Sequence, residues 1–193
     1  MTIVDTIADL SSFSQSQIVK KTLTTSSGGT VAAQHRLAAM AGASTLAEGG
    51  NAIDAAIATS FTIGVAEPWM SGLGGGGAMI VYKADTDETS VIDFNMCSPA
   101  DLDPADFPLT DGVADDLFPW SRVEGDRNLK GPAAIAVPGL VDGMATAHAK
   151  HATMPWRDLL QPAIMLAEAG PRIDWYTSLM TVACVADLAA DPE

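Results

Sequence analysis

A run of glycines limits the possible folds of this chain more than any other feature of its sequence. The five glycines lie between an apolar, alanine-rich segment and a second apolar segment that is predicted to be a strand: Gly72, Gly74, Gly75, Gly76 and Gly77. Residues without a Cβ let two backbones approach closely or adopt a positive φ. Because structured segments flank the run on both sides, we expect a close-packed site and not a linker.

The segment before the glycines is predicted to contain a short strand and two helices. The strand is expected at Thr30 to Ala33, and a helix of about a dozen residues should follow it and end at the Gly49-Gly50 pair. Asn51 then begins a second helix, which ends at Glu67-Pro68. The many alanines of this helix leave a slim surface that another layer can approach closely.

The segment after the glycines predicts a β-hairpin in a layered fold. Its strands are expected at Ala78 to Lys83 and at Ser90 to Phe94. Apolar residues occur on both faces, so we expect a sheet covered on both sides and therefore a layered α/β arrangement. The residues from Ala100 to Lys130 carry many Asp and Pro and are predicted to form a long surface excursion that walls a pocket.

The remaining residues are predicted to form one strand and three helices. The strand is expected at Ala134 to Val137, and the first helix begins near Leu140. The second helix runs from Pro155 to Gly170, with proline suited to its first position and Trp156 packing inward. The third helix is expected from Ile173 to Leu188.

Length and local composition predict one compact domain preceded by an arm. A chain of 193 residues can form a domain with its own core, or part of one. Residues 1–27 are rich in Ser and Thr without a strong period, which favours an N-terminal arm. Residues 28–193 are expected to form the domain.

Charge and hydropathy exclude several classes of function. Ten Lys and Arg against 24 Asp and Glu give a formal net charge of -14. Phosphate backbones and anionic membrane surfaces would be repelled, so we expect no nucleic acid and no membrane partner. No stretch of about 18 apolar residues is present that would span a bilayer. The start of the chain lacks the apolar core and cleavage site of a secretory signal, which predicts a cytoplasmic protein.

Several side chains invite a chemical role, and each has a structural alternative. Asp54 lies in the first turn of an expected helix, where an acid usually complements the positive helix end, with catalysis as the alternative. Cys97 and Cys184 are far apart and are expected to be buried or idle thiols, and not a disulfide or a metal site. His148 and His151 share a helix face but lack a third ligand, which favours an exposed helix end over a metal site. We therefore expect no metal.

The glycine run also suggests a phosphate cradle, and the sequence argues against one. A Walker loop needs Lys and then Ser or Thr after its last glycine, where this chain has Ala78-Met79. A dinucleotide-binding fold places a strand before its glycines and a helix after them, whereas the order here is helix, glycines, strand. No nucleotide cofactor is expected.

Three motifs in one order resemble a known family. They are GGNAxDAA at residues 49–56, SGxGGGG at residues 71–77, and a VPG strand end at residues 137–139 that is followed by a PW helix start at residues 155–156. Together they resemble the amino-terminal part of the large subunit of gamma-glutamyltranspeptidases. The resemblance covers Val31 to about Glu193.

The resemblance implies a four-layer αββα sandwich of the amino-terminal-nucleophile (Ntn) hydrolase type, present here in part and completed by a partner chain or a missing segment. It implies a precursor that cuts itself into the two chains of a heterodimer. The new amino-terminal threonine of the small chain would be the nucleophile, with its own α-amine as base. The implied enzyme is a hydrolase and acyltransferase of glutathione metabolism, acting without a cofactor on a gamma-glutamyl or other small amide.

The sequence departs from the family pattern in one place that concerns the nucleophile. Nothing in the 193 residues matches the family's cleavage motif, so we expect no catalytic residue in this chain. The expected partner is a small subunit or C-terminal segment that carries the threonine. The alternative function is a non-catalytic binding or assembly module that kept the fold and lost the chemistry.

A second departure concerns the substrate. In the family, an Arg-Glu pair follows the strand after the glycine block, and the arginine binds the α-carboxylate of the gamma-glutamyl donor through two hydrogen bonds. Asn95 and Met96 occupy those places here, and an amide carries no charge. Losing a charge-assisted pair costs on the order of 1.5 to 3 kcal/mol.

Three accounts of Asn95 stay open. The charge is supplied from the excursion, with Arg122, Arg127 and Lys130 as candidates. Alternatively the substrate is another amide, such as oxamate or the acylated side chain of a β-lactam. In the third account Asn95 is a hydrogen-bonded strand end with no substrate contact.

Overall fold

The computed structural model describes residues 25–113 and 119–190. The chain divides into two compact units, Met1–Thr30 and Val31–Glu193, and every helix and strand below belongs to the second unit. The arm expected at residues 1–27 lies almost wholly outside the described residues, so this domain boundary stays a prediction.

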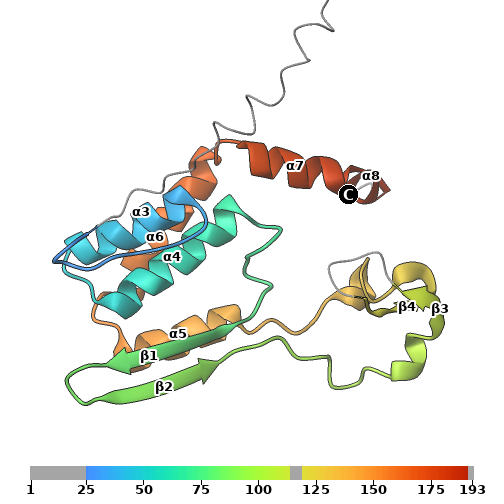
Figure 1. The fold of residues 1–193 in the computed structure, drawn as a ribbon, viewed down its shortest axis with the longest axis horizontal. Helices are drawn as coiled ribbons and strands as arrows, with labels where there is room; N and C mark the ends of the chain where they lie inside the picture. Colours follow the sequence, from blue (N-terminus) through green and yellow to red (C-terminus); the bar gives the residue numbers. More distant parts are fainter. Residues whose placement is uncertain (1–24, 114–118, 191–193) are drawn as a thin grey trace, which may run out of the picture. The chain divides into compact units, whose positions relative to one another are not determined.

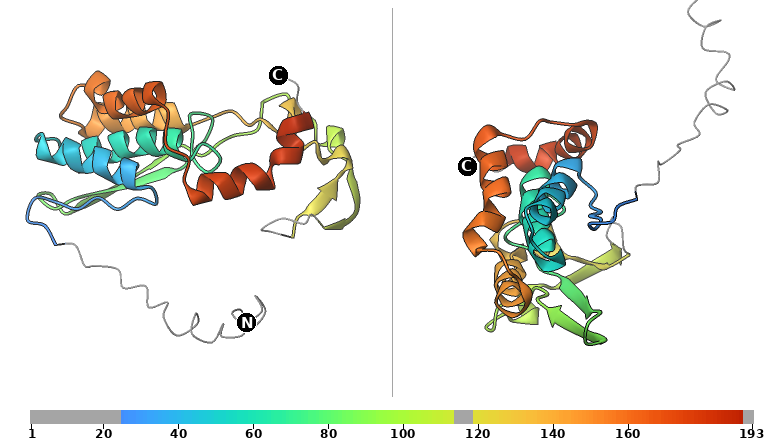
Figure 2. Two further views of the ribbon diagram at one scale, coloured as in Figure 1. Left: turned by 90° about the horizontal axis from the view of Figure 1, so that it is seen from above. Right: turned by 90° about the vertical axis from the view of Figure 1, so that its left-hand side faces the viewer.

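Three helices lie side by side and carry much of the core (Figures 1 and 2). They are α3 (Arg36–Ala47), α4 (Ala52–Ala66) and α6 (Trp156–Ala169). The predicted beginning of α4 is confirmed: Asn51 is its N-cap and accepts hydrogen bonds from the N–H of Ile53 and of Asp54. Gly42 lets α3 approach α4, because a Cβ there would lie 3.0 Å from the carbonyl oxygen of Ala55.

The predicted hairpin is also confirmed. Strands β1 (Ala78–Lys83) and β2 (Glu88–Asp93) pair antiparallel, with Val81 opposite Ser90. Helix α5 (Leu140–His151) contacts β2, and the inward side chains of the sheet join a core with Ile57, Phe61, Met144 and Leu159.

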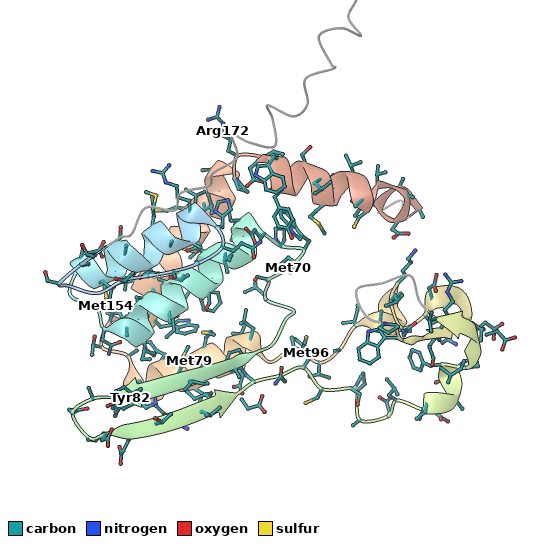
Figure 3. All side chains as sticks on the ribbon, viewed as in Figure 1. Met70, Met79, Tyr82, Met96, Met154 and Arg172 are labelled. Carbon is teal, nitrogen blue, oxygen red and sulfur yellow. The ribbon has the colours of Figure 1, made fainter. Side chains whose placement is uncertain are left out.

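Only one face of this sheet is covered by the residues described. Val81 and Ile92 are buried on the helical side, and Met79 packs against the same core. On the opposite face Ile80 is 73%, Tyr82 61% and Val91 63% exposed. Figure 3 labels Met79 and Tyr82, from these two sides, on β1. One sheet and its helical layer are therefore present, and the far side of the sheet is open in the described residues.

The described residues of the excursion between Ala100 and Lys130 are mostly exposed, as predicted, but they contain a hairpin. Strands β3 (Leu109–Val113) and β4 (Ser121–Val123) pair antiparallel with an irregular register, beginning with Leu109 opposite Val123. Short 3-10 turns occupy Pro104–Asp106 and Glu124–Asp126.

Two predicted strands are wrong. Residues 30–33 form no strand, because no partner strand among the described residues pairs with them. In place of a strand at Ala134 to Val137 the chain has a 3-10 turn at Pro132–Ala134 and one bridge between Val137 and Cys97. Pro138 follows directly and has no N–H with which to extend that bridge.

The C-terminal helices differ from the prediction in detail. Gly170, with φ of 76°, ends α6 as expected, but Pro155 is its N-cap and not its first residue. The single helix expected from Ile173 to Leu188 is two, α7 (Trp175–Ala183) and α8 (Val185–Ala190), separated at Cys184.

Of the two states expected for the cysteines, buried or idle, the structure excludes burial. Cys97 and Cys184 are exposed, free thiols. Cys184 lies between two helices with no buried residue, and Cys97 lies on the connection from β2 to the excursion, so neither position is covered by a second layer.

Candidate functional site

Phe94 and Asn95, which directly follow β2, lie where the glycine block meets the sheet. Phe94 exchanges two backbone hydrogen bonds with Gly77, with N···O distances of 2.9 and 3.2 Å. A Cβ on Gly76 would lie 2.7 Å from both the Phe94 oxygen and the Met96 nitrogen. Glycine is required at position 76 because any side chain would overlap this backbone.

The VPG segment joins the same place from the other side. The Gly75 oxygen accepts hydrogen bonds from the N–H of Gly139 and of Leu140, both 3.0 Å long, so α5 begins against the glycine block. A Cβ on Gly139 would overlap the Phe94 carbonyl, and one on Gly143 would overlap the Phe94 ring. Two of the three sequence motifs therefore converge on the residue before Asn95.

The third motif is tied to the fold through a buried carboxylate. Asp54 is fully buried and closes a capping box with Asn51, whose N–H donates to Oδ2 at 2.8 Å. Its oxygens also accept from the hydroxyl of Thr153 at 2.6 Å and from the N–H groups of Thr153 and Met154. The expected role in the first helical turn is confirmed, and the same carboxylate also holds the loop between α5 and α6.

The ionisation of Asp54 follows from these contacts. Burial raises the pKa of Asp54, but the hydrogen bonds from Thr153, Asn51 and Met154 outweigh burial and hold the pKa below its ordinary value of 3.8. A carboxylate whose oxygens are occupied by four donor groups of the protein is a structural anchor and not a free general base.

Asn95 is exposed and held in one orientation by Asp93. Its side-chain Nδ2 and its backbone N–H both donate to Asp93 Oδ1, at 2.9 and 3.1 Å. Because a carboxylate only accepts hydrogen bonds, the amide nitrogen must face Asp93. The amide oxygen of Asn95 is therefore the end that is left for another molecule.

Asn95 and Asp93 line a polar pocket of about 460 Å³ between the end of β2 and α5. From α5 the pocket receives Asp142, Thr146 and Lys150, which are spaced by four residues and so share one helix face. Lys150 is exposed and has no ion-pair partner among the described residues. Sequence reasoning missed Lys150, although its spacing from the VPG motif places it on the face that begins beside Asn95.

The three cations proposed from the excursion do not line this pocket. Arg122 lies on β4, and the Arg127 guanidinium carbon is 5.8 Å from the centre of the Phe107 ring. Lys130 Nζ forms an ion pair with Asp187 at 2.7 Å. In residues 25–113 and 119–190, no hydrogen bond or ion pair joins any of the three to Asn95.

The excursion does wall a pocket, but a different one. A mainly apolar hollow of about 700 Å³ is lined by residues of the excursion and of the segments on either side of it, among them Met96, Cys97, Phe107 and Val123. Met96, labelled in Figure 3, lies where β2 leads into the excursion. Cys97 is shared by this hollow and the Asn95 pocket.

The prediction that His148 and His151 form an exposed helix end is wrong. The chain turns back after α5, so both residues are half-buried. His148 Nε2 is 2.9 Å from the Met154 oxygen, and its ring packs edge-on against Trp156. Both ring nitrogens of His151 are buried without a hydrogen-bond partner. The described part of the chain contains no group of three potential metal ligands.

The β1–β2 sheet with its helical layer corresponds to part of the layered αββα fold of amino-terminal-nucleophile hydrolases, the class to which the solved structures of similar fold belong. The family model described as gamma-glutamyltranspeptidase matches residues 38–193, and the chain belongs to this family. The family indicated by the three sequence motifs is confirmed. The chain covers the amino-terminal part of the large subunit.

Curated relatives include hydrolases and acylases. The chain is 44% identical over 146 residues to a glutathione hydrolase proenzyme from Bacillus subtilis (strain 168), covering 76% of this chain and 24% of that protein. It is 40% identical over 168 residues to the acylase ACY 1 proenzyme of Pseudomonas sp. (strain V22), covering 87% of this chain and 29% of that protein. The chain thus spans about a quarter of the length of these relatives.

Solved structures agree with the sequence comparison. The gamma-glutamyltranspeptidase of Helicobacter pylori superposes with a TM-score of 0.75 at 28% identity, over 89% of this chain and 46% of that one. The enzyme from Pseudomonas nitroreducens, solved in complex with L-DON, gives 0.72 at 30% identity, over 86% of this chain and 47% of that one. Within the described residues, no helix combines the length and apolar character that crossing a bilayer requires.

Proposed function

We propose that this chain is part of a self-processing amidohydrolase and acyltransferase that acts on a gamma-glutamyl or other small amide. The acyl group is transferred to a threonine on a small subunit or segment outside these 193 residues. The names of the relatives support this proposal, since they are glutathione hydrolase and acylase proenzymes. The observation that carries it is the convergence of the glycine block and the VPG segment on Phe94, which places Asn95 in a polar pocket.

The chain contributes a pocket wall with two complementary groups. The free amide oxygen of Asn95 accepts a hydrogen bond from an N–H of the substrate, because its nitrogen is held by Asp93. Lys150 supplies the positive charge that Asn95 lacks, since its ammonium has no ion-pair partner among the described residues and lies in the same pocket. A gamma-glutamyl amide carries an ammonium group and a carboxylate. Its ammonium group donates to the amide oxygen of Asn95, and its carboxylate pairs with the ammonium of Lys150.

Self-processing is tested on the full-length protein by intact mass spectrometry. Two chains whose masses sum to that of a longer precursor would support self-processing. Hydrolysis of a gamma-glutamyl anilide or a short acyl amide by the processed protein would support the proposed enzymatic activity. A single uncleaved species without amidase activity would contradict it and leave the non-catalytic module. The expected cytoplasmic location stays a prediction.

A further inference from the structure

Glu67, the C-cap of α4, is a buried acid whose side chain has no partner among the described residues. Its side chain is only 4% exposed, yet its carboxylate has no hydrogen bond and no ion pair within the described ranges. Taking an ionised carboxylate out of water is expensive unless a cation or hydrogen-bond donors compensate it. The Glu67 side chain thus lines the hollow described next without a partner from the described residues.

Glu67 lines a hollow of about 370 Å³ whose rim carries another acid. The rim residues are Gln34, His35, Arg36, Asp174, Trp175 and Tyr176. Asp174 is held in place as the N-cap of α7, with Oδ1 accepting from the N–H of Thr177 at 2.7 Å. This hydrogen bond lowers the pKa of Asp174, so its carboxylate stays ionised near neutral pH.

Arg36, the one arginine among the described residues of the rim, forms no ion pair with Glu67. Arg36 is exposed to solvent, and no described carboxylate lies within ion-pair distance of its guanidinium. His35 accepts a hydrogen bond at Nδ1 from the N–H of Leu37, at 3.1 Å. The hollow thus combines two acidic side chains, Glu67 and Asp174, with the exposed guanidinium of Arg36, and His35 lies close enough to help lower the pKa of Asp174.

Two aromatic residues, Trp175 and Tyr176, line the hollow, and Trp69 packs against Tyr176. Tyr176 packs between two indoles, with ring centres 5.7 Å from Trp69 and 5.5 Å from Trp175. The indole Nε1 of Trp69 is itself buried without a hydrogen-bond partner. Aromatic faces attract cations, and the attraction is stronger where the site contains little water.

We propose that this hollow, the Glu67 pocket, binds an organic cation, a primary ammonium or a guanidinium group. The carboxylate of Glu67 pairs with the cation at the base of the pocket, and Asp174, Trp175 and Tyr176 contact it at the rim. The cation comes either from a free small molecule or from a Lys or Arg side chain in the part of the full-length protein outside these residues.

The two sources are separated by binding and stability measurements on the full-length protein. The binding probe is methylguanidinium chloride, titrated by calorimetry at fixed ionic strength, with sodium chloride as the salt control. The test variant is Glu67→Gln, which keeps the shape of the side chain and removes its charge. The matched control is Glu48→Gln, which removes a charge from the exposed end of α3.

A free cation as the source predicts saturable, one-to-one binding of the probe to the wild type. Glu67→Gln should weaken this binding at least tenfold, and Glu48→Gln should leave it unchanged. A side chain of the same protein as the source predicts no probe binding, but a Tm about 4 °C or more lower in Glu67→Gln than in Glu48→Gln, because one partner of a buried pair is removed.

One result overturns the proposal. If the wild type binds no probe and Glu67→Gln is as stable as the wild type or more stable, then Glu67 was an uncompensated charge and the pocket holds no cation. Saturable binding of equal strength in Glu67→Gln would also contradict the pocket, since it would show that the probe binds elsewhere. Neither result depends on amidase activity.

Discussion

Asp54 and Thr153 are hydrogen-bonded across 99 positions of the sequence, through both the backbone N–H and the hydroxyl of Thr153. The contact fixes the first turn of α4 to the loop between α5 and α6. Asn51 strengthens the same junction, because its side-chain amide donates to the oxygen of His151 at 2.7 Å. The GGNAxDAA motif thus connects the start of α4, through hydrogen bonds, to the end of α5 and the loop before α6.

Replacing Asp54 by asparagine should destabilise the fold by about 2 to 3 kcal/mol, because one of the buried donors would then face an NH₂ group and lose its acceptor. The free energy of unfolding from denaturant titration measures this. Asp158→Asn is the matched control, an exposed acid in the first turn of α6. It should lose less than about 1 kcal/mol, the usual size of a helix-dipole contact. Equal losses of unfolding free energy in both variants would show that Asp54 contributes no more than a helix-dipole contact.

Stability should also depend on pH through Asp54. Its pKa is lowered in the folded state, so its contribution is fully present above the ordinary value of 3.8 and is lost as the pH falls from there through the lower folded value. Denaturant titrations from pH 6 down to about pH 3 should show a steeper loss of stability in the wild type than in Asp54→Asn. Parallel profiles for the two proteins would show that Asp54 is not the group that titrates.

The glycine block should tolerate a side chain at one position and not at another. In Gly76→Ala the new Cβ would lie 2.7 Å from the backbone of Phe94 and Met96, so we expect a loss of about 1 to 3 kcal/mol or more. Gly74→Ala has nothing within 4 Å of its Cβ and should fold with little change. Thermal unfolding of both variants checks the difference, and a stable Gly76→Ala would refute the close approach at Phe94.

A guanidinium at position 95 should improve the use of a gamma-glutamyl donor. In the processed full-length protein, Asn95→Arg adds a bidentate partner for the α-carboxylate, and kcat/KM for a gamma-glutamyl anilide should rise roughly tenfold. Thr86→Arg adds the same charge in the turn between β1 and β2 and should change little. If Asn95→Arg folds and is not improved, Asn95 does not contact the donor.

Lys150 should matter for donors that carry a carboxylate. Lys150→Gln is expected to raise KM for a gamma-glutamyl anilide roughly tenfold, and to affect an uncharged acyl anilide much less, because only the first substrate loses an ion pair. Lys83→Gln, at the exposed end of β1, is the control for the loss of charge. The same effect on both substrates would point to a structural role for Lys150.

The order of helices and the β1–β2 hairpin were predictable because their signals are local. Asn51 as an N-cap, Gly170 as a helix end and the turn between the strands each act within a few residues. The two wrong strands, at residues 30–33 and 134–137, failed for the opposite reason. A strand needs a partner, and apolar runs do not reveal whether one is present.

The candidate site was predictable only in part. Asn95 was found because it stands in a motif, whereas Lys150 became visible only when α5 was placed against β2. The acids Asp54 and Glu67 look alike in sequence as lone acids at helix ends. Their difference arises from tertiary contacts, since the loop after α5 reaches Asp54 and no described residue bonds to the carboxylate of Glu67.

The open face of the β1–β2 sheet bears on how this polypeptide must be produced. Within residues 25–113 and 119–190, Ile80, Tyr82 and Val91 present a row of apolar side chains to solvent, and each strand of the two-stranded sheet has an unpaired edge. Apolar faces beside free edges are typical starting points for aggregation. A polypeptide limited to these residues should accumulate as assemblies or inclusion bodies, and a soluble preparation should require co-synthesis with whatever layer covers Tyr82.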